Sequence, residues 1–127
     1  MARPSSTQPT EVELQILRIL WTQGPSPVRE IHRYLEQEKG TNYSTTVKML
    51  AVMRDKGLVK RDESVSPHIY RAGLTQEKAQ TRMLNDLIKK VYDGSAQSLV
   101  LHALSSQKAS AEDIEAIRRI LDDMKGE

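Results

Sequence analysis

Apolar residues recur at every third or fourth position in three successive runs between residues 10 and 57, which predicts three amphipathic helices. The first begins at the capping box Thr10-Glu11-Val12-Glu13 and ends at Gly24-Pro25. We expect the second to take Ser26 as its N-cap and Pro27 as its first residue, where proline is well tolerated. Three helices thus fit into fewer than fifty residues.

The third helix is predicted to have Ser44 as its N-cap and to end at Gly57. Two rotations of this helix about its axis fit the pattern. In the first, the buried face is Met49, Leu50 and Met53, and the exposed residues are Ser44, Thr45, Lys48 and Val52. In the second, the buried face is Val47, Leu50 and Ala51, and the residues turned outward are Thr46 and Met49. The pattern alone does not choose between them.

After Gly57 the periodicity changes to that of strands. Two short β-capable runs, residues 58–61 and 68–71, flank a polar segment at residues 62–67 and predict a hairpin, or wing. Three more helices are predicted to follow: one capped by Thr75 and ended by Asp93-Gly94, one from about Ser95 to Leu104, and one that starts at the Ser110 cap.

This order of elements is typical of a mainly α protein with a winged helix-turn-helix, made of three helices and a β-hairpin wing, followed by C-terminal dimerisation helices. We expect three parts: a flexible leader at residues 1–9, a winged-helix DNA-binding domain at 10–74 and a helical dimerisation domain at 75–127. In the last helix, apolar residues repeat with the 3-4-3 spacing of a packing seam.

Composition narrows the functional classes. With 127 residues the chain has room for one hydrophobic core, and the absence of cysteine excludes disulfides, thiolate metal sites and cysteine nucleophiles. No apolar run could span a bilayer and no apolar signal segment is visible, so we expect a cytoplasmic protein. The histidines fall on three different elements, and no catalytic motif is present. We therefore expect no enzyme activity, no metal and no cofactor.

The distribution of charge points to a polyanionic partner. Residues 1–74 hold eleven Lys and Arg against eight Asp and Glu, a net +3, whereas residues 75–127 hold eight against nine, a net −1. Residues 44–61 hold five basic side chains against one acidic side chain, a net +4. A helix-turn-helix inserts the N-terminal end of its second helix into the DNA major groove. The basic segment contains the helix that would enter the groove, which favours DNA as the partner.

Specific contacts follow from side-chain chemistry. Lys48 is suited to donate to guanine O6 and N7, Thr45 to reach a base edge or a thymine methyl, and Tyr43 with Ser44 to bind phosphate. The full set predicted to bind DNA is Tyr43, Ser44, Thr45, Thr46, Lys48, Lys60, Arg61 and Arg71. Alternatively, Lys48 is only solvated, and Arg61 and Arg71 form ion pairs with Asp62 or Glu63 in the hairpin.

Four segments carry a family resemblance: residues 13–21, 43–46, 56–61 and 98–101. In their order and spacing they resemble the penicillinase-repressor (BlaI/MecI-type) family of winged-helix transcriptional repressors, over nearly all of residues 10–125. The resemblance implies a homodimer that represses transcription from a dyad-symmetric DNA operator and pairs through its C-terminal helices. It also implies a membrane-bound metalloprotease sensor as a partner, which commonly cuts such repressors within the penultimate helix.

The chain departs from the family pattern at two points. Penicillinase-type members are cut after an Asn-Phe pair, where this chain has His102-Ala103 as the possible cleavage site. The copper-responsive branch carries C-terminal cysteine pairs, and their absence here excludes copper sensing through thiolates.

A small helix-turn-helix domain that contacts one DNA half-site rarely binds tightly unless a second, symmetry-related copy binds the other half-site. The apolar stripe of the last helix is therefore predicted to form a dimer interface. The predicted interface is Leu87, Val91, Leu99, Leu101, Ile117, Leu121 and Met124. Alternatively, these residues pack only within their own chain. The alternative to a dimeric repressor is a winged-helix module for protein–protein contact, without specific DNA binding.

Overall fold

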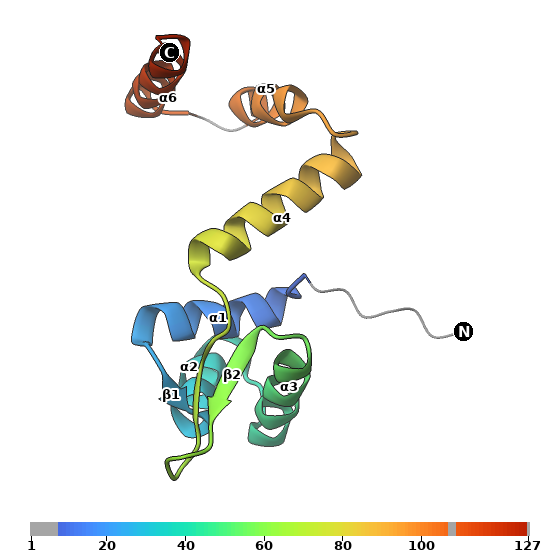
Figure 1. Cartoon of the computed structure of the whole chain (residues 1–127), viewed down its shortest axis with the longest axis vertical. Coiled ribbons are helices and arrows are strands. Elements are labelled where there is room, and N and C mark those ends of the chain that lie inside the picture. Colours follow the sequence, from blue (N-terminus) through green and yellow to red (C-terminus); the bar gives the residue numbers. More distant parts are fainter. Residues whose placement is uncertain (1–7, 107–108, 127) are drawn as a thin grey trace, which may run out of the picture. The chain divides into compact units, whose positions relative to one another are not determined.

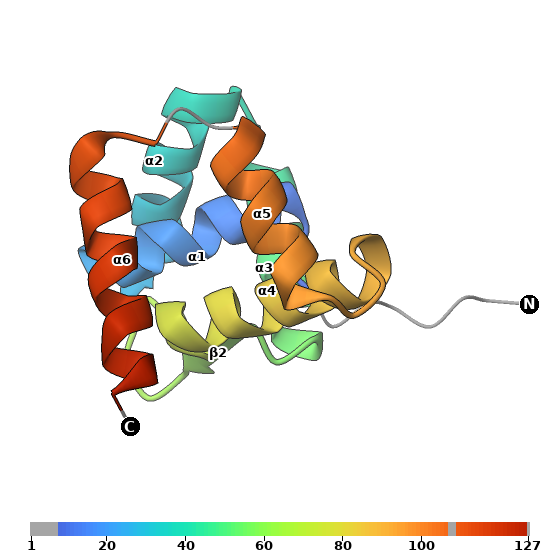
Figure 2. The same cartoon turned by 90° about the horizontal axis from the view of Figure 1, so that it is seen from above.

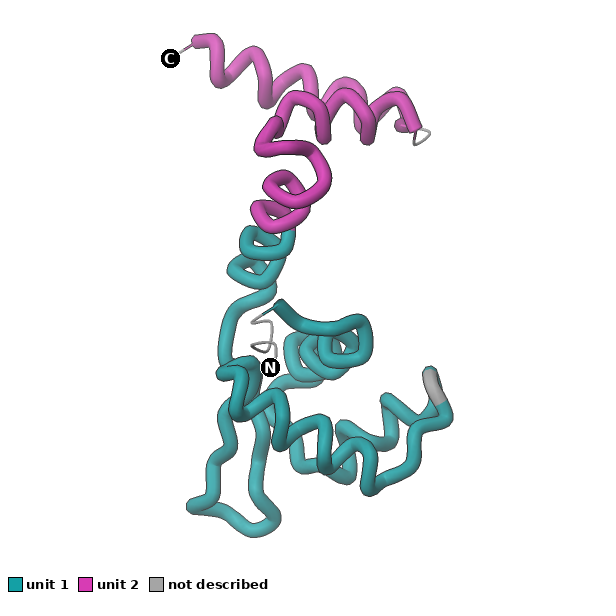
Figure 3. The backbone as a smooth tube through the Cα atoms, turned by 90° about the vertical axis from the view of Figure 1, so that its right-hand side faces the viewer, with its two compact units in different colours: residues 1–83 teal, residues 84–127 magenta. Residues whose placement is uncertain are grey.

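The computed structural model describes residues 8–106 and 109–126, so most of the expected leader lies outside the described residues. The chain divides into two compact units, residues 1–83 and 84–127 (Figure 3). The division falls within helix α4 (Gln76–Val91), downstream of the expected boundary at residues 74 and 75.

The first unit opens with three helices in the predicted order: α1 (Glu11–Gln23), α2 (Val28–Lys39) and α3 (Tyr43–Asp55) (Figures 1 and 2). The capping box of α1 is confirmed. The Thr10 hydroxyl accepts from the Glu13 amide at 3.2 Å, and the Glu13 carboxylate accepts from the Thr10 amide at 2.9 Å.

The prediction that Ser26 caps α2 is wrong. Ser26 and Pro27 are extended and form β1 (Ser26–Pro27), in which Ser26 lies opposite Tyr70. The Ser26 hydroxyl donates to the Gly24 carbonyl at 2.8 Å instead of accepting from the helix. Because pairing with a distant strand holds both residues, α2 begins one residue later, with Pro27 as its N-cap and no side-chain cap.

The N-cap of α3 is Asn42, so the prediction of Ser44 is also wrong. The Asn42 side-chain oxygen accepts from the Thr45 amide at 3.0 Å, from the Ser44 hydroxyl at 2.9 Å and from the Thr45 hydroxyl at 2.8 Å. Asparagine is among the strongest N-caps, and its extended backbone starts the helix earlier than the serine would. The two hydroxyl side chains of the first turn are thereby held in place.

The predicted hairpin is confirmed as β2 (Val59–Asp62) and β3 (Ile69–Ala72). Together with β1 they form an antiparallel sheet in the order β1-β3-β2. The register places Lys60 opposite Arg71. The loop between β2 and β3 projects beyond the helices of its unit as a wing (Figure 1).

A single hydrophobic core joins these elements. Its buried residues come from all three helices and from the sheet: Ile16, Leu17, Ile19, Leu20, Ile31, Leu35, Leu50, Met53, Leu58, Val59 and Tyr70. The indole of Trp21 packs at the edge of this core and donates to the Leu74 carbonyl at 3.0 Å, which ties the chain leaving the wing back to α1. Helix α3 and the wing are thus anchored on one core.

The rest of the chain forms α4, α5 (Ala96–Ser106) and α6 (Ala111–Lys125), as predicted. The cap of α6 is confirmed, because the Ser110 hydroxyl accepts from the Asp113 amide at 3.0 Å. The Thr75 hydroxyl accepts from the Lys78 amide at 3.1 Å at the start of α4. None of the helices in the described residues is long and apolar enough to cross a membrane.

The second unit buries little of its apolar surface. No residue of α5 or α6 described by the structure is buried. The helical spacing in α4 predicts core positions at Met83, Leu84, Leu87, Ile88 and Val91. Within one chain Met83 and Ile88 are half-buried, whereas Leu84, Leu87 and Val91 are exposed, Val91 by 66%. The prediction is therefore wrong for these three residues, because nothing in the described unit covers them.

A buried ion pair ties the end of α3 to the start of α1. Lys56 Nζ lies 2.9 and 3.1 Å from the two carboxylate oxygens of Glu13, and these side chains are only 14% and 5% exposed. Lys56 belongs to the basic segment that favours DNA, but its charge is neutralised within the fold. It is a structural residue rather than part of the basic surface.

We expect Lys56→Met to lower the free energy of unfolding by about 3 kcal/mol, because it leaves the buried Glu13 carboxylate without its cation. Adding Glu13→Gln should recover most of the loss, since glutamine keeps the capping box and removes the buried charge. Urea unfolding followed by the fluorescence of Trp21, the only tryptophan, measures both. Lys48→Met is the matched control at an exposed lysine, and an equal effect of the two lysine substitutions contradicts the prediction.

Candidate nucleic-acid interface

The buried face of α3 is Thr46, Leu50 and Met53, with Met49 half-buried. Val47 and Ala51, which the second rotation would bury, are exposed. The first rotation is therefore correct.

The exposed side of α3 carries the four residues that the first rotation turns outward, and Tyr43 of the predicted DNA-binding set is exposed at the start of the helix. These five residues are Tyr43, Ser44, Thr45, Lys48 and Val52. Lys48 has no ion-pair partner among the residues that the structure describes. Its charge is available to an external ligand.

Thr46 does not belong to the DNA-facing set. It is fully buried, and its hydroxyl lies 2.9 Å from Nδ1 of His32 and 3.5 Å from the Asn42 carbonyl oxygen. A side chain enclosed between α2 and α3 cannot reach a base edge. We therefore correct the prediction that Thr46 contacts DNA.

His32 links α2 to the first turns of α3. Besides the bond to Thr46, its Nε2 lies 3.2 Å from the Glu36 carboxylate, and its ring meets the ring of Tyr43 edge-on with centroids 5.3 Å apart. These contacts fix the rotation of α3 about its own axis. His32 is a positioning residue that the sequence reasoning missed, because its role depends on a partner fourteen positions away.

Two like charges lie side by side on the wing. Lys60 and Arg71 face each other in the register of β2 and β3, and both are exposed. Like charges directly opposite each other destabilise an antiparallel pair. Besides the hydrogen bonds from Ser64, the charge of Arg71 lowers the pKa of Asp62, so Arg71 also has an acidic neighbour within the hairpin.

Arg61 points elsewhere. Its guanidinium donates to the Glu63 carboxylate, from Nε at 2.9 Å and also from Nη2. Hydrogen bonds of the Arg61 side chain, first with Tyr70 and then with Glu63, raise its pKa, and the Arg61 bond lowers the pKa of Glu63. The predicted alternative, an ion pair within the hairpin, is thus confirmed for this residue, and its contact with phosphate remains a prediction.

The acidic side chains of the wing are engaged locally. Hydrogen bonds from the Ser64 hydroxyl and amide hold the pKa of Asp62 below its usual value. Glu63 is held by Arg61. Among the described residues, no group of three His, Cys, Asp or Glu is arranged to hold a metal ion. The candidate interface consists of exposed hydroxyl, phenol and cationic groups on α3 and on the strands of the wing.

Comparisons with known proteins identify the family of this chain and several relatives. Residues 9–123 match the family model described as penicillinase repressor. A penicillinase repressor of Staphylococcus aureus is 22% identical over 112 residues, covering 88% of this chain and 89% of the relative. The transcriptional regulator BlaI of Mycobacterium tuberculosis is 23% identical over 117 residues, covering 91% and 83%. Among solved structures, the transcriptional repressor BigR from Xylella fastidiosa is 27% identical with a TM-score of 0.41, over 64% of this chain and 74% of that one.

The bond between His32 and Thr46 is tested by a double-mutant cycle. Thr46→Val keeps the shape of the side chain and removes the hydroxyl, so we expect it to lower the free energy of unfolding by about 1 kcal/mol. In a chain that already carries His32→Ala, the same substitution should cost much less, because the bond is already absent. Urea unfolding of the four chains measures the coupling, and strictly additive effects would show that the two side chains do not interact.

Proposed function

Because this chain belongs to the penicillinase repressor family, a family of transcriptional repressors and not of enzymes, we propose that it acts as a homodimer on a dyad-symmetric DNA operator. The observation that carries the proposal is the outward face of α3, which presents Thr45 and Lys48 beside a wing bearing Lys60 and Arg71. Each winged-helix unit reads one half-site.

In this proposal α3 lies in the major groove. A groove about 12 Å wide admits the end of a helix, and the first two turns of α3 carry the groups that distinguish bases. Lys48 donates to guanine O6 and N7, and Thr45 contacts a neighbouring base edge. Tyr43 and Ser44 bind the adjacent phosphates. The bonds from Ser44 and Thr45 to Asn42 support this arrangement, since they order the side chains before DNA arrives.

The wing supplies contacts that do not depend on sequence. Lys60 and Arg71 bind phosphate oxygens, which relieves the repulsion between their charges. Arg61 contributes a phosphate contact only if it exchanges its bond with Glu63, so we assign it a smaller share of the binding energy than Lys60 or Arg71.

Dimerisation through the second unit is supported by its uncovered apolar surface. Of the predicted interface residues, Leu87, Val91, Leu101, Leu121 and Met124 are exposed, and Leu99 and Ile117 are half-buried. Single-chain packing, the alternative, leaves these side chains in water. A cavity of about 210 Å³ beside α6, lined by Leu104, Ile114, Ile117, Arg118 and Leu121, offers a place for an apolar side chain of the partner.

Release of repression by proteolysis stays a prediction. His102 and Ala103 are exposed within α5, and the His102 ring is held by the Tyr92 hydroxyl at 2.8 Å. A cut between them would separate α6 from the rest of the dimerisation unit and weaken operator binding by mass action. A protease could seat this bond only after local opening of α5, and the membrane-bound metalloprotease sensor is the proposed partner for that step.

Titration with DNA at several salt concentrations tests the function against the alternative of a protein-interaction module. The probes are a duplex of the DNA immediately upstream of the chain's own gene, chosen by searching that DNA for an inverted repeat, and a random duplex of equal length. We expect tighter binding to the repeat and a steep fall in affinity with salt. Equal, weak and salt-insensitive binding to both duplexes would favour the interaction module.

Lys48→Ala should reduce the preference for the operator by about 1–3 kcal/mol, because it removes a base contact and leaves the fold intact. Lys60→Ala should instead weaken binding to operator and random duplex about equally and lower the salt slope by about one for each phosphate that is no longer neutralised. The two variants serve as controls for each other. An unchanged operator preference in the Lys48 variant would refute the assignment of α3 as the reading helix.

Leu121→Asp should give monomers with weak operator binding, because a carboxylate in an apolar interface has no partner to offset its desolvation. Sedimentation equilibrium measures the oligomeric state. Glu115→Asp, a conservative change at an exposed position of the same helix, is the control and should remain dimeric. A stable dimer formed by the Leu121 variant would exclude this residue from the interface.

A further inference from the structure

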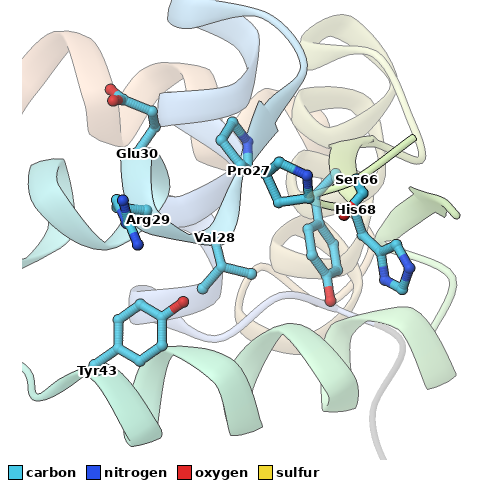
Figure 4. Close-up of a pocket in the computed structure, with 9 residues that line it drawn as sticks. Pro27, Val28, Arg29, Glu30, Tyr43, Ser66 and His68 are labelled. Carbon is cyan, nitrogen blue, oxygen red and sulfur yellow. The ribbon is translucent and has the colours of Figure 1, made fainter.

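A cleft of about 540 Å³ lies in the first unit between the start of α2, the start of α3 and the returning limb of the wing (Figure 4). Val28 points into it from α2. Arg29 and Tyr43 lie on one side of it, and Ser66 and His68 lie on the other. Neither Arg29 nor His68 belongs to the DNA-binding set predicted from the sequence.

The polar groups around this cleft suit an anion. Arg29 carries a permanent positive charge, is exposed, and has no ion-pair partner among the described residues. The phenol of Tyr43 and the imidazole of His68 add hydrogen-bonding groups from two further elements. Glu30 is the acidic residue of the lining, and its carboxylate is engaged by Arg33 at 2.8 Å. The cleft therefore offers donors from three separate elements around a partly apolar floor.

The position of the cleft identifies the anion. A helix in the major groove is bordered on each side by a sugar–phosphate strand. A protein element next to that helix must therefore contact one of these strands or extend across it. The wing stands beside α3, and the cleft separates the two. A phosphodiester strand that borders the groove read by α3 would pass through this opening.

We propose that this cleft holds the DNA strand between the groove-reading helix and the wing, with Arg29 and His68 contacting its phosphates from opposite walls. The inference rests on the proposed function and extends it to residues outside α3 and the strands of the wing. Tyr43 belongs to both sets, since it lines the cleft and also begins the reading helix. Arg29 carries the larger share, because a guanidinium offers a positive charge and five N–H donors, whereas an imidazole offers at most two donors.

The first test uses Arg29→Ala in the full chain, titrated with operator and with random duplex at several salt concentrations. We expect about tenfold weaker binding to both duplexes and a salt slope lower by about one for each cleft in the complex. His68→Ala should weaken binding in the same sense by a smaller factor. Arg18→Ala, at an exposed arginine of α1 that does not line the cleft, is the control and should bind as the parent chain does.

The second test locates the contact on the DNA. Single phosphates of the operator are replaced by neutral methylphosphonates, one at a time, along the strands bordering the groove. At one position in each half-site, the replacement should weaken DNA binding by the parent chain about tenfold. The same replacement should have little further effect on DNA binding by the Arg29 variant, because the two changes remove the same charge–charge interaction.

The outcomes separate the inference from the proposed function. If the parent chain prefers the operator and the Arg29 variant binds as tightly as the parent, or no phosphate position is coupled to Arg29, the cleft does not hold the strand and the proposed function stands. If the parent chain does not prefer the operator, both fail. Operator binding is also measured with added inorganic phosphate, which should compete for the cleft of the parent chain and compete less in the Arg29 variant. If phosphate weakens operator binding of the parent and of the variant equally, the inference is overturned.

Discussion

The burial of one face of α3 against α2 and β2 is the constraint on which the rest of the structure depends. Leu50 and Met53 are completely buried, and burying a side chain of this size contributes about 1.5–3 kcal/mol. A rotation of the helix by about one residue, to the face Val47, Leu50 and Ala51, would turn Met53 out of the core. The same burial directs Lys48 and Thr45 outward, so the buried apolar face of α3 determines which side chains form the surface proposed to read DNA.

Polar contacts at both ends of α3 complete this anchoring. Asn42 caps the first turn and orders its hydroxyl side chains, and His32 bonds to the buried Thr46 hydroxyl one turn further on. Beyond the last turn, Lys56 enters a buried ion pair with Glu13, which also completes the capping box of α1. The basic segment thus contains cations of two kinds. Lys56 is used to hold the helix in place, whereas Lys48 lies on the outward side of α3, where a ligand can reach it.

Much of this architecture could be predicted from the sequence because its signals are local. The capping boxes at Thr10 and Ser110 and the change of period after Gly57 depend on residues within a few positions of one another, and all three are found in the structure. The absence of a cap at Ser26 could not be predicted, because it results from the pairing of this residue with Tyr70, more than forty positions away. The roles of His32 and Lys56 depend likewise on distant partners. Cleft residues such as Arg29 and His68 come together only when the wing folds back beside α2.

The two units expose surfaces of different chemical character, each suited to a different partner. The first buries an apolar core and exposes cationic and hydrogen-bonding groups, and the second exposes apolar stripes that a single chain does not cover. The proposed dimer on DNA would cover both surfaces. Hydroxyl-radical footprinting of the full chain on the DNA immediately upstream of its own gene tests this most directly. The account predicts two protected backbone patches related by the dyad, with centres about one helical turn or a whole number of turns apart. A single patch, or uniform protection along the duplex, would contradict it.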